Sequence, residues 1–309
     1  MAFNLLNGLL VHYDCEGTAG LLSSTTFPEG APTTNFTEQN TVALVDPGKF
    51  GTARGPCSGT FGSGGDGFSK TIAANGPWDW RGGSISMSVG TWVYLDSAAG
   101  GQILYEHSGT AENQRAWALR AVHDLGGGAT SPVVFFRDNT AGNWNFAFAV
   151  PQDQSGIAGG QATGEWVYMG LSFDAGTKFA SLYYGSPTDG EHYSSFDASA
   201  INGGAGPFDG WSSLSDPLVV GTNRGTASSV GSAGLSGDID HIDVWNRALT
   251  QLEWSYLFNG GAGRETSEYV QNLAPGPLPL RAAAASYRRA AARNSLNQRV
   301  YLDAAKRRT

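Results

Sequence analysis

The chain has 309 residues and a net charge of −8, with 44 Gly, 40% hydrophobic residues and only 15% charged residues. Gly is at roughly twice its usual share and charged residues are well below the usual quarter, a composition typical of many tight turns between short strands. The share of hydrophobic residues excludes wholesale disorder, and the absence of a Gly-X-Y repeat excludes a collagen. No run approaches the roughly 18 apolar residues of a transmembrane helix.

The first predicted element is a strand over Leu9 to Tyr13, and no basic segment precedes it. We therefore expect no signal peptide. A chain made without one first meets a reducing cytosol, so Cys15 and Cys57 are expected as free thiols. The sequence leaves open whether they form a bridge later.

Alternation of apolar and polar residues predicts strands as far as about Val244. In SISMSVGTWVYLD the residues on the apolar face are Ile85, Met87, Val89, Val93 and Leu95. In EWVYMGLSFD they are Val167, Met169, Leu171 and Phe173, and the opposite face carries Trp166, Tyr168 and Ser172. Other strands are predicted at Gln102 to Glu106, Trp117 to Val122, Val133 to Arg137, Trp144 to Val150, Phe179 to Tyr184 and Leu218 to Gly221. Many short strands without intervening helices predict an all-β fold, a two-sheet antiparallel jelly-roll sandwich.

One short helix is predicted near the end of the sandwich, in ALTQLEWSYLFNGG. Thr250 and Glu253 have the spacing of a capping box, and Leu249 and Trp254 that of a hydrophobic staple. Asn259 and the Gly after it supply the stop signal.

The charge is concentrated at the C-terminal end. Residues 281–309 carry eight basic residues against one acidic residue, a net charge of +7, so the remaining 280 residues carry −15. Pro275, Pro277 and Pro279 form a stiff spacer before this segment, and RAAAASYRRAAAR is rich in helix formers. We predict a sandwich domain over 1–262, a Gly/Pro-rich linker over 263–280 and a basic helical tail over 281–309.

The segment GLSGDIDHIDVWNRALTQLEWSYLFNGGAG resembles the final strand and following helix of the laminin-G-like (LamG) jelly rolls, which have the concanavalin A-like fold. Weaker matches precede it in the right order: NGLLVHYDCEG, PGKFGTA, SISMSVGTWVYLD, and GEWVYMGLSFD followed by SLYYG. The resemblance covers roughly residues 8 to 262 and implies a concanavalin A-like lectin/glucanase sandwich.

Alternation in DIDHIDVW places Asp240 on the same face as Ile242 and Val244, at the rim of the core. A buried carboxylate requires a cation or several hydrogen-bond donors. The resemblance implies calcium, held by Asp240 together with Asp14 or Glu16. The alternative is an Asp240 that accepts hydrogen bonds from backbone N–H groups.

The acidic triplet Asp238, Asp240 and Asp243 is similar to the catalytic triplet of laminarinase-type hydrolases. Here Asp stands at both ends of the triplet, where that family has Glu, and without a bulge Asp243 points away from the other two residues. The five His residues show no metal-binding spacing. We therefore expect no enzymatic activity.

Aromatic residues in predicted loops are candidate carbohydrate-binding residues: Trp78, Trp80 and Trp144. The alternative is that they close the ends of the sandwich, because Trp is usually buried.

The tail is predicted to bind other virion or assembly proteins. Its arginines can form bidentate pairs with carboxylates, and they are Arg281, Arg288, Arg289, Arg293 and Arg299. The acidic body opposes nucleic-acid binding, the Ala-rich face disfavours membrane insertion, and a second copy of the chain is a further candidate partner.

These expectations favour a virion protein, which is made in the host cytoplasm without a signal peptide and is exposed only after lysis. The leading hypothesis is a non-enzymatic virion surface protein of the phage capsid decoration or fibre type. Its jelly roll would face outward and its basic tail would anchor it. The alternatives are a lectin-like carbohydrate-binding module and a glycoside hydrolase or lyase of the same fold.

Overall fold

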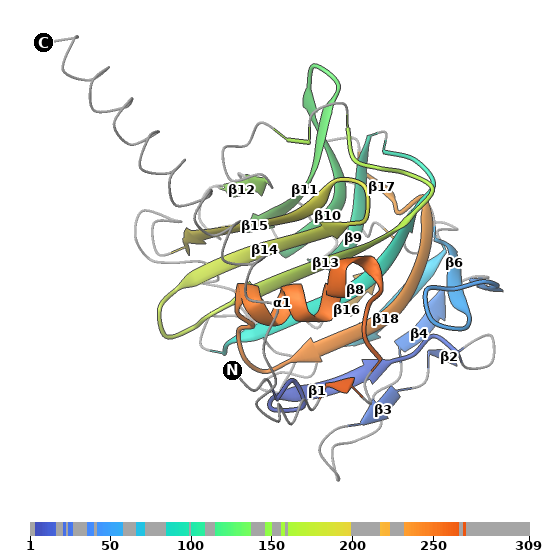
Figure 1. Ribbon diagram of the computed structural model, residues 1–309, viewed down its shortest axis with the longest axis horizontal. Helices are drawn as coiled ribbons and strands as arrows, with labels where there is room; N and C mark the ends of the chain where they lie inside the picture. Colours follow the sequence, from blue (N-terminus) through green and yellow to red (C-terminus); the bar gives the residue numbers. More distant parts are fainter. Residues whose placement is uncertain are drawn as a thin grey trace, which may run out of the picture. The chain divides into compact units, whose positions relative to one another are not determined.

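The computed structural model describes residues 4–16, 21–22, 24–26, 36–39, 42–57, 66–71, 85–98, 100–108, 115–136, 146–149, 156–157, 160–198, 217–222, 232–265 and 268–269. These residues belong to one compact unit, Asn4–Val270 (Figure 1). No helix among them is long and apolar enough to cross a membrane. The predicted tail lies outside the described residues.

The first sheet has the strand order β15-β14-β13-β8-β18-β1-β3, with β6 beside β18 and β5 beside β6. Its strands are Gly190–Asp197 (β15), Phe179–Ser186 (β14), Trp166–Phe173 (β13), Met87–Leu95 (β8), Gly237–Trp245 (β18), Leu9–Tyr13 (β1), Ser24–Thr26 (β3), Ala53–Cys57 (β6) and Ala43–Val45 (β5). The first and last long strands of the sandwich, β1 and β18, are therefore neighbours.

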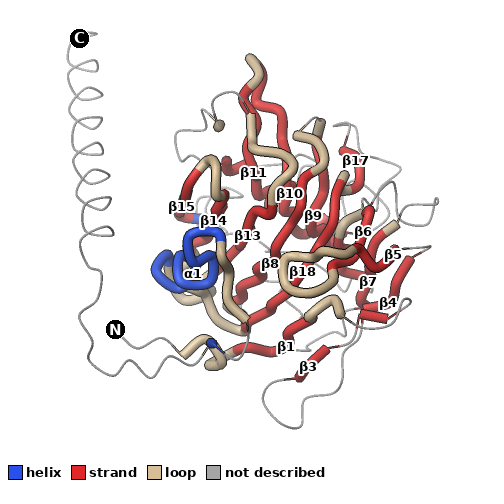
Figure 2. The backbone as a smooth tube through the Cα atoms, turned by 45° about the vertical axis from the view of Figure 1, so that its right-hand side comes forward, coloured by secondary structure: helices blue, strands red, loops and turns tan. Residues whose placement is uncertain are grey.

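The second sheet has the order β12-β11-β10-β9-β16-β7-β4-β2, with β17 beside β9. Its strands are Phe146–Ala149 (β12), Ala129–Phe136 (β11), Arg115–Gly126 (β10), Gly101–Ser108 (β9), Pro217–Val220 (β16), Gly67–Thr71 (β7), Phe36–Gln39 (β4), Leu21–Leu22 (β2) and Ser232–Gly234 (β17). Figure 2 shows the strands of both sheets. The described strand pairs are antiparallel apart from β17 and β9. This arrangement confirms the predicted sandwich.

The core between the sheets contains the side chains of β8 and β13 that alternation predicts for it. Met87, Val89, Val93 and Leu95 of β8 are buried there, as are Val167, Met169, Leu171 and Phe173 of β13. Cys15 and Cys57 lie in the same core as free thiols. Tyr168 points to the opposite, outer face of the first sheet, also as predicted.

Helix α1 (Gln251–Phe258) covers part of that outer face, and the 3-10 helix η4 (Asn259–Gly261) follows it. The predicted capping box is present, because Thr250 Oγ1 accepts the Glu253 N–H and the Glu253 carboxylate accepts the Thr250 N–H. Asn259 ends the helix in the left-handed conformation at φ 50°. Leu249 and Trp254 lie in one buried cluster under the helix.

Small residues in the first sheet make room for the helix. Gly90 and Gly170 are direct partners on β8 and β13, and Trp254 lies against both. An added Cβ at Gly170 would lie 2.6 Å from the Trp254 ring, and one at Gly185 would lie 2.6 Å from Phe258. The absence of a Cβ at these glycines therefore lets α1 lie close to the strands.

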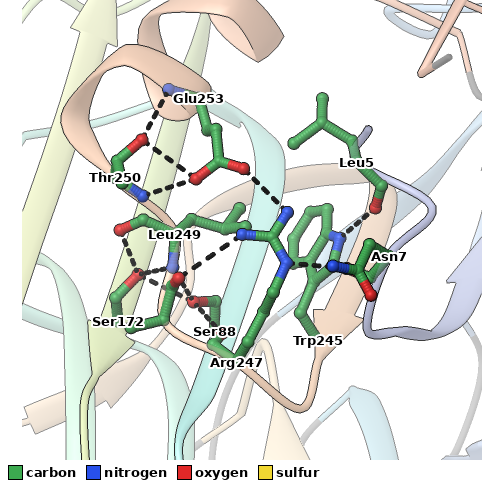
Figure 3. Close-up of polar contacts among 10 residues, drawn as sticks. Leu5, Asn7, Ser88, Ser172, Trp245, Arg247, Leu249, Thr250 and Glu253 are labelled. Carbon is green, nitrogen blue, oxygen red and sulfur yellow. Dashed lines mark hydrogen bonds and ion pairs between the residues drawn. The ribbon is translucent and has the colours of Figure 1, made fainter. Parts of the chain in front are cut away.

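Polar contacts hold the segment before α1 to the sheet (Figure 3). Ser88 Oγ and Ser172 Oγ, 2.7 Å apart on neighbouring strands, both accept the Leu249 N–H. Arg247 forms an ion pair with Glu253 at 2.7 Å. Burial raises the pKa of the Glu253 carboxyl, but Arg247 and Thr250 outweigh burial, so this pKa is lowered. The beginning of the helix is thus fixed over the sheet.

The predicted orientation of Asp240 is wrong. The pairing of β18 with β8 shifts between Asp240 and Ile242, and the extra residue His241 has φ 47°. This β-bulge reverses the alternation after Asp240. Ile239, Ile242 and Val244 face the core, whereas Asp240 pairs with Trp92 on the outer face.

Candidate functional site

A buried polar cluster joins β1, β18 and Tyr269 on the outer face of the first sheet. His12 Nδ1 lies 2.6 Å from Asp243 Oδ1, and the Tyr269 hydroxyl donates to Asp243 Oδ2 at 2.5 Å. Burial alone would lower the pKa of His12, but the Asp243 carboxylate outweighs it, so the pKa is raised. Leu5 N also donates to Tyr269 O, so residues beyond Gly263, in the predicted linker, contact the sandwich. Both oxygens of the Asp243 carboxylate are engaged within the protein.

Asp240 and His241 continue this cluster toward the loop at Phe50. Phe50 N donates to Asp240 Oδ2 at 2.8 Å, and the Phe50 ring stacks on His241 at 4.3 Å. Burial raises the pKa of Asp240 to about 7, and burial with His12 nearby lowers that of His241 to about 3. Lys49 lies 4.3 Å from the Trp92 ring centroid. The loop therefore closes this part of the sheet.

The three predicted calcium ligands are engaged in different ways. Asp14 Oδ1 accepts the Glu16 N–H at 3.2 Å, and Glu16 accepts the Thr52 N–H at 2.7 Å. Asp240 Oδ1 is buried and has no hydrogen-bond partner. In the described part of the chain, no three side chains of His, Cys, Asp or Glu lie together as a metal site. Of the three, Asp240 is the one with a buried oxygen that lacks a hydrogen-bond partner, and calcium there would rely on backbone or water oxygens.

The bulge also changes the interpretation of the acidic triplet. Because alternation is reversed after Asp240, Asp238, Asp240 and Asp243 all lie on the outer face, which the sequence did not predict. Asp240 and Asp243 are nevertheless 0% and 1% exposed. A glycosidase needs two carboxyl groups that flank the substrate bond. Only Asp238, which is half-buried, meets that requirement of access.

One row of side chains crosses three neighbouring strands on the outer face of the first sheet, and its Trp166 packs against the edge of the cluster under α1. Trp166 of β13 pairs with Tyr94 of β8, and Tyr94 pairs with Asp238 of β18. The two rings are 5.6 Å apart in an edge-to-face arrangement. All three side chains are half-buried. We call Trp166, Tyr94 and Asp238 the outer row.

The next row on the same strands has the same chemistry but is closed. Tyr168 pairs with Trp92, and Trp92 with Asp240. Phe258 stacks on Trp92 at 5.9 Å, and Trp254 lies 6.0 Å from Tyr168. The buried row supports the helix, whereas the outer row keeps part of its surface exposed to solvent.

Further carboxylates lie near the outer row. Burial and the charge of Asp96 raise the pKa of Asp238 to about 6. Asp96 is exposed, and its N–H donates to Ser236 O. Glu165, next to Trp166 in the chain, accepts hydrogen bonds from the Ser186 and Thr188 hydroxyls. The row therefore combines two aromatic rings with carboxylates on a fixed backbone.

The carbohydrate-binding residues predicted from the sequence, Trp78, Trp80 and Trp144, lie outside the described residues, as do the tail arginines. Sequence reasoning did not select the outer row. The sequence does contain a signal for its two aromatic residues. Alternation places Trp166 on the face opposite the core, and the same alternation in β8 places Tyr94 on that face.

Comparison with known proteins identifies the fold. No family model matches the chain, and no curated protein matches it. A solved structure of botulinum neurotoxin type C, described as dependent on two ganglioside molecules for cell entry, has a TM-score of 0.52 at 12% identity and covers 84% of this chain and 53% of that one. The binding domain of botulinum neurotoxin DC in complex with rat synaptotagmin II has a TM-score of 0.50 at 11% identity, over 82% of this chain and 52% of that one. The present chain spans about half the length of each botulinum neurotoxin chain, and the likeness shows a shared β-sandwich.

Proposed function

We propose that the chain is a non-enzymatic carbohydrate-binding module of the LamG type, and that its sugar-binding surface is the outer row. The observation that carries the proposal is the half-buried aromatic pair of Tyr94 and Trp166 beside the Asp238 carboxylate. Aromatic faces with a few fixed polar groups are the usual lining of small-ligand sites. The ganglioside interaction named for one similar structure, and the binding domain that forms the other, support a binding role.

Binding is favoured over hydrolysis by the state of the acidic triplet. Asp243 is held by His12 and Tyr269, and Asp240 is closed under the Phe50 loop. Of the triplet, Asp238 alone keeps access to solvent. It can accept hydrogen bonds from sugar hydroxyls, but one carboxylate cannot be both the acid and the nucleophile that glycoside hydrolysis needs.

The experiment combines a binding and a turnover measurement on the full chain. An array of immobilised glycans measures binding, and an assay of newly formed reducing ends on the bound glycans measures hydrolysis. We expect binding without release of sugar. Release that is lost in Asp238→Asn would instead support a hydrolase, and an array without any bound glycan would contradict the proposal.

We further propose that this module acts on a virion surface, anchored through the basic tail. The +7 of residues 281–309 beside the −15 of the remaining chain supports an attachment segment of this kind. Mass spectrometry of purified particles tests it. Stoichiometric recovery of the chain with the particles is expected, and its absence from them would rule out the virion role.

A further inference from the structure

We infer that the outer row selects neutral sugars and rejects acidic ones, an inference that rests on the proposed carbohydrate-binding function. Its starting point is the position of the charges. Asp238 is directly opposite Tyr94 in the β18–β8 register, and Asp96 follows two residues after Tyr94. The carboxylates therefore border the aromatic rings on one side.

The backbone holds this arrangement in place. Strands lie about 4.8 Å apart, so a row across three of them is about 10 Å long. Gly55 of β6 lies directly beside Asp238, since an added Cβ there would be 1.7 Å from its Oδ1. Gly164 N donates to Leu95 O and fixes the loop next to the Tyr94 hydroxyl. A ligand thus meets preformed rings and a preformed acceptor, which reduces the cost of binding.

The chemistry of the row favours a sugar without a negative charge. The apolar face of a pyranose can lie on the rings of Trp166 and Tyr94 while its hydroxyls donate to the Asp238 carboxylate. A carboxylated sugar, such as a sialic acid, would place a second negative charge beside Asp238 and Asp96. Like charges brought together at an interface suppress the wrong partner.

No described cation on these strands offsets this repulsion at the row itself. Lys49 lies over Trp92 in the adjacent, closed row and donates to Gly261 O. The net charge of −15 outside the tail acts in the same direction over longer distances. Local and overall charge therefore both disfavour acidic glycans.

The test uses the full chain at pH 8 with matched pairs of glycans that differ only in a terminal sialic acid. We expect the neutral member to bind about tenfold more tightly, and we expect Asp96→Asn/Asp238→Asn to reduce this ratio to about threefold or less. Asp124→Asn is the control, because Asp124 is an exposed carboxylate near the end of β10 in the other sheet. It should leave the ratio unchanged.

The outcomes separate this inference from the proposed function. Tighter binding of the sialylated member, or a ratio that the double variant does not change, would overturn the selectivity while binding itself stands. Absence of binding to either member would remove the proposed function and this inference with it. A preference for the neutral glycan that falls as the salt concentration rises would support the selectivity, since screening weakens repulsion between exposed charges.

Discussion

His12 of β1 and Asp243 of β18 lie directly opposite each other, and a 2.6 Å contact joins His12 Nδ1 to Asp243 Oδ1 inside the protein. The pair connects the first strand of the sandwich to the last one. Tyr269 adds a second hydrogen bond to the same carboxylate. The N-terminal strand, the final strand and the segment after α1 therefore share one buried charge.

The first prediction concerns the stability that this pair contributes. His12→Ala leaves the Asp243 carboxylate without its partner charge and should lower the free energy of unfolding by about 3–5 kcal/mol. Because the folded state raises the pKa of His12, the contribution is fully present below about 6.5 and is lost as pH rises through the raised pKa. Urea unfolding at pH 6 and pH 9 measures both effects.

His192→Ala is the control for this change, since His192 is half-buried on β15. It should cost less than about 1 kcal/mol. If His12→Ala lowers the free energy of unfolding by the same amount at both pH values, His12 and Asp243 are not an ion pair in the folded protein.

The second prediction concerns the glycines under α1. Gly170→Ala places a Cβ 2.6 Å from the Trp254 ring and should cost about 1–3 kcal/mol by overpacking. Trp254→Leu combined with Gly170→Ala should restore part of the loss, which a double-mutant cycle would detect as coupling. Strictly additive effects would mean that α1 does not rest on Gly170.

The course of the first sheet follows from alternation and turn chemistry, so the core faces of β8 and β13 and the capping box of Thr250 could be predicted. The bulge at His241 could not, because it depends on the pairing of β18 with β8 and β6 and leaves no period in the sequence. That one residue places Asp240 on the outer face, while Ile242 and Val244 keep the core face that alternation predicts for them. The candidate site was missed for a related reason: Trp166, Tyr94 and Asp238 are far apart in the chain, and only strand register makes them neighbours.

The third prediction tests calcium at Asp240. The unpaired Asp240 Oδ1 is the observation that keeps this proposal. We expect calcium to raise the melting temperature only at roughly millimolar concentrations, since few charged ligands are at hand, and we expect Asp240→Asn to abolish the rise. Melting curves that are identical in EDTA and in excess calcium would leave Asp240 as a structural acceptor of the Phe50 N–H.

The fourth prediction concerns the basic tail. Deletion of residues 275–309 should leave the melting temperature of the sandwich largely unchanged, because the described residues already form a compact unit that ends at Val270. Attachment to particles should be lost, and for the full chain it should weaken with salt. Charge reversal at Arg288 and Arg289 should impair attachment more than reversal of two exposed charges of the sandwich. Unfolding of the truncated chain would show that the tail belongs to the domain.

The most direct measurement of the central claim is the affinity of the full chain for a glycan that it binds on the array, with Trp166→Ala compared with Phe179→Ala. Both aromatic side chains keep exposed surface on the first sheet, but Trp166 belongs to the outer row and Phe179 begins β14 away from it. We expect Trp166→Ala to weaken binding by about tenfold or more and Phe179→Ala to leave it within about twofold, as for the loss of an anchoring and a non-anchoring aromatic residue. Tyr94→Ala, which removes the facing ring, should match Trp166→Ala. Equal affinities for all three variants and the unaltered chain, with melting temperatures that show them folded, would contradict the account.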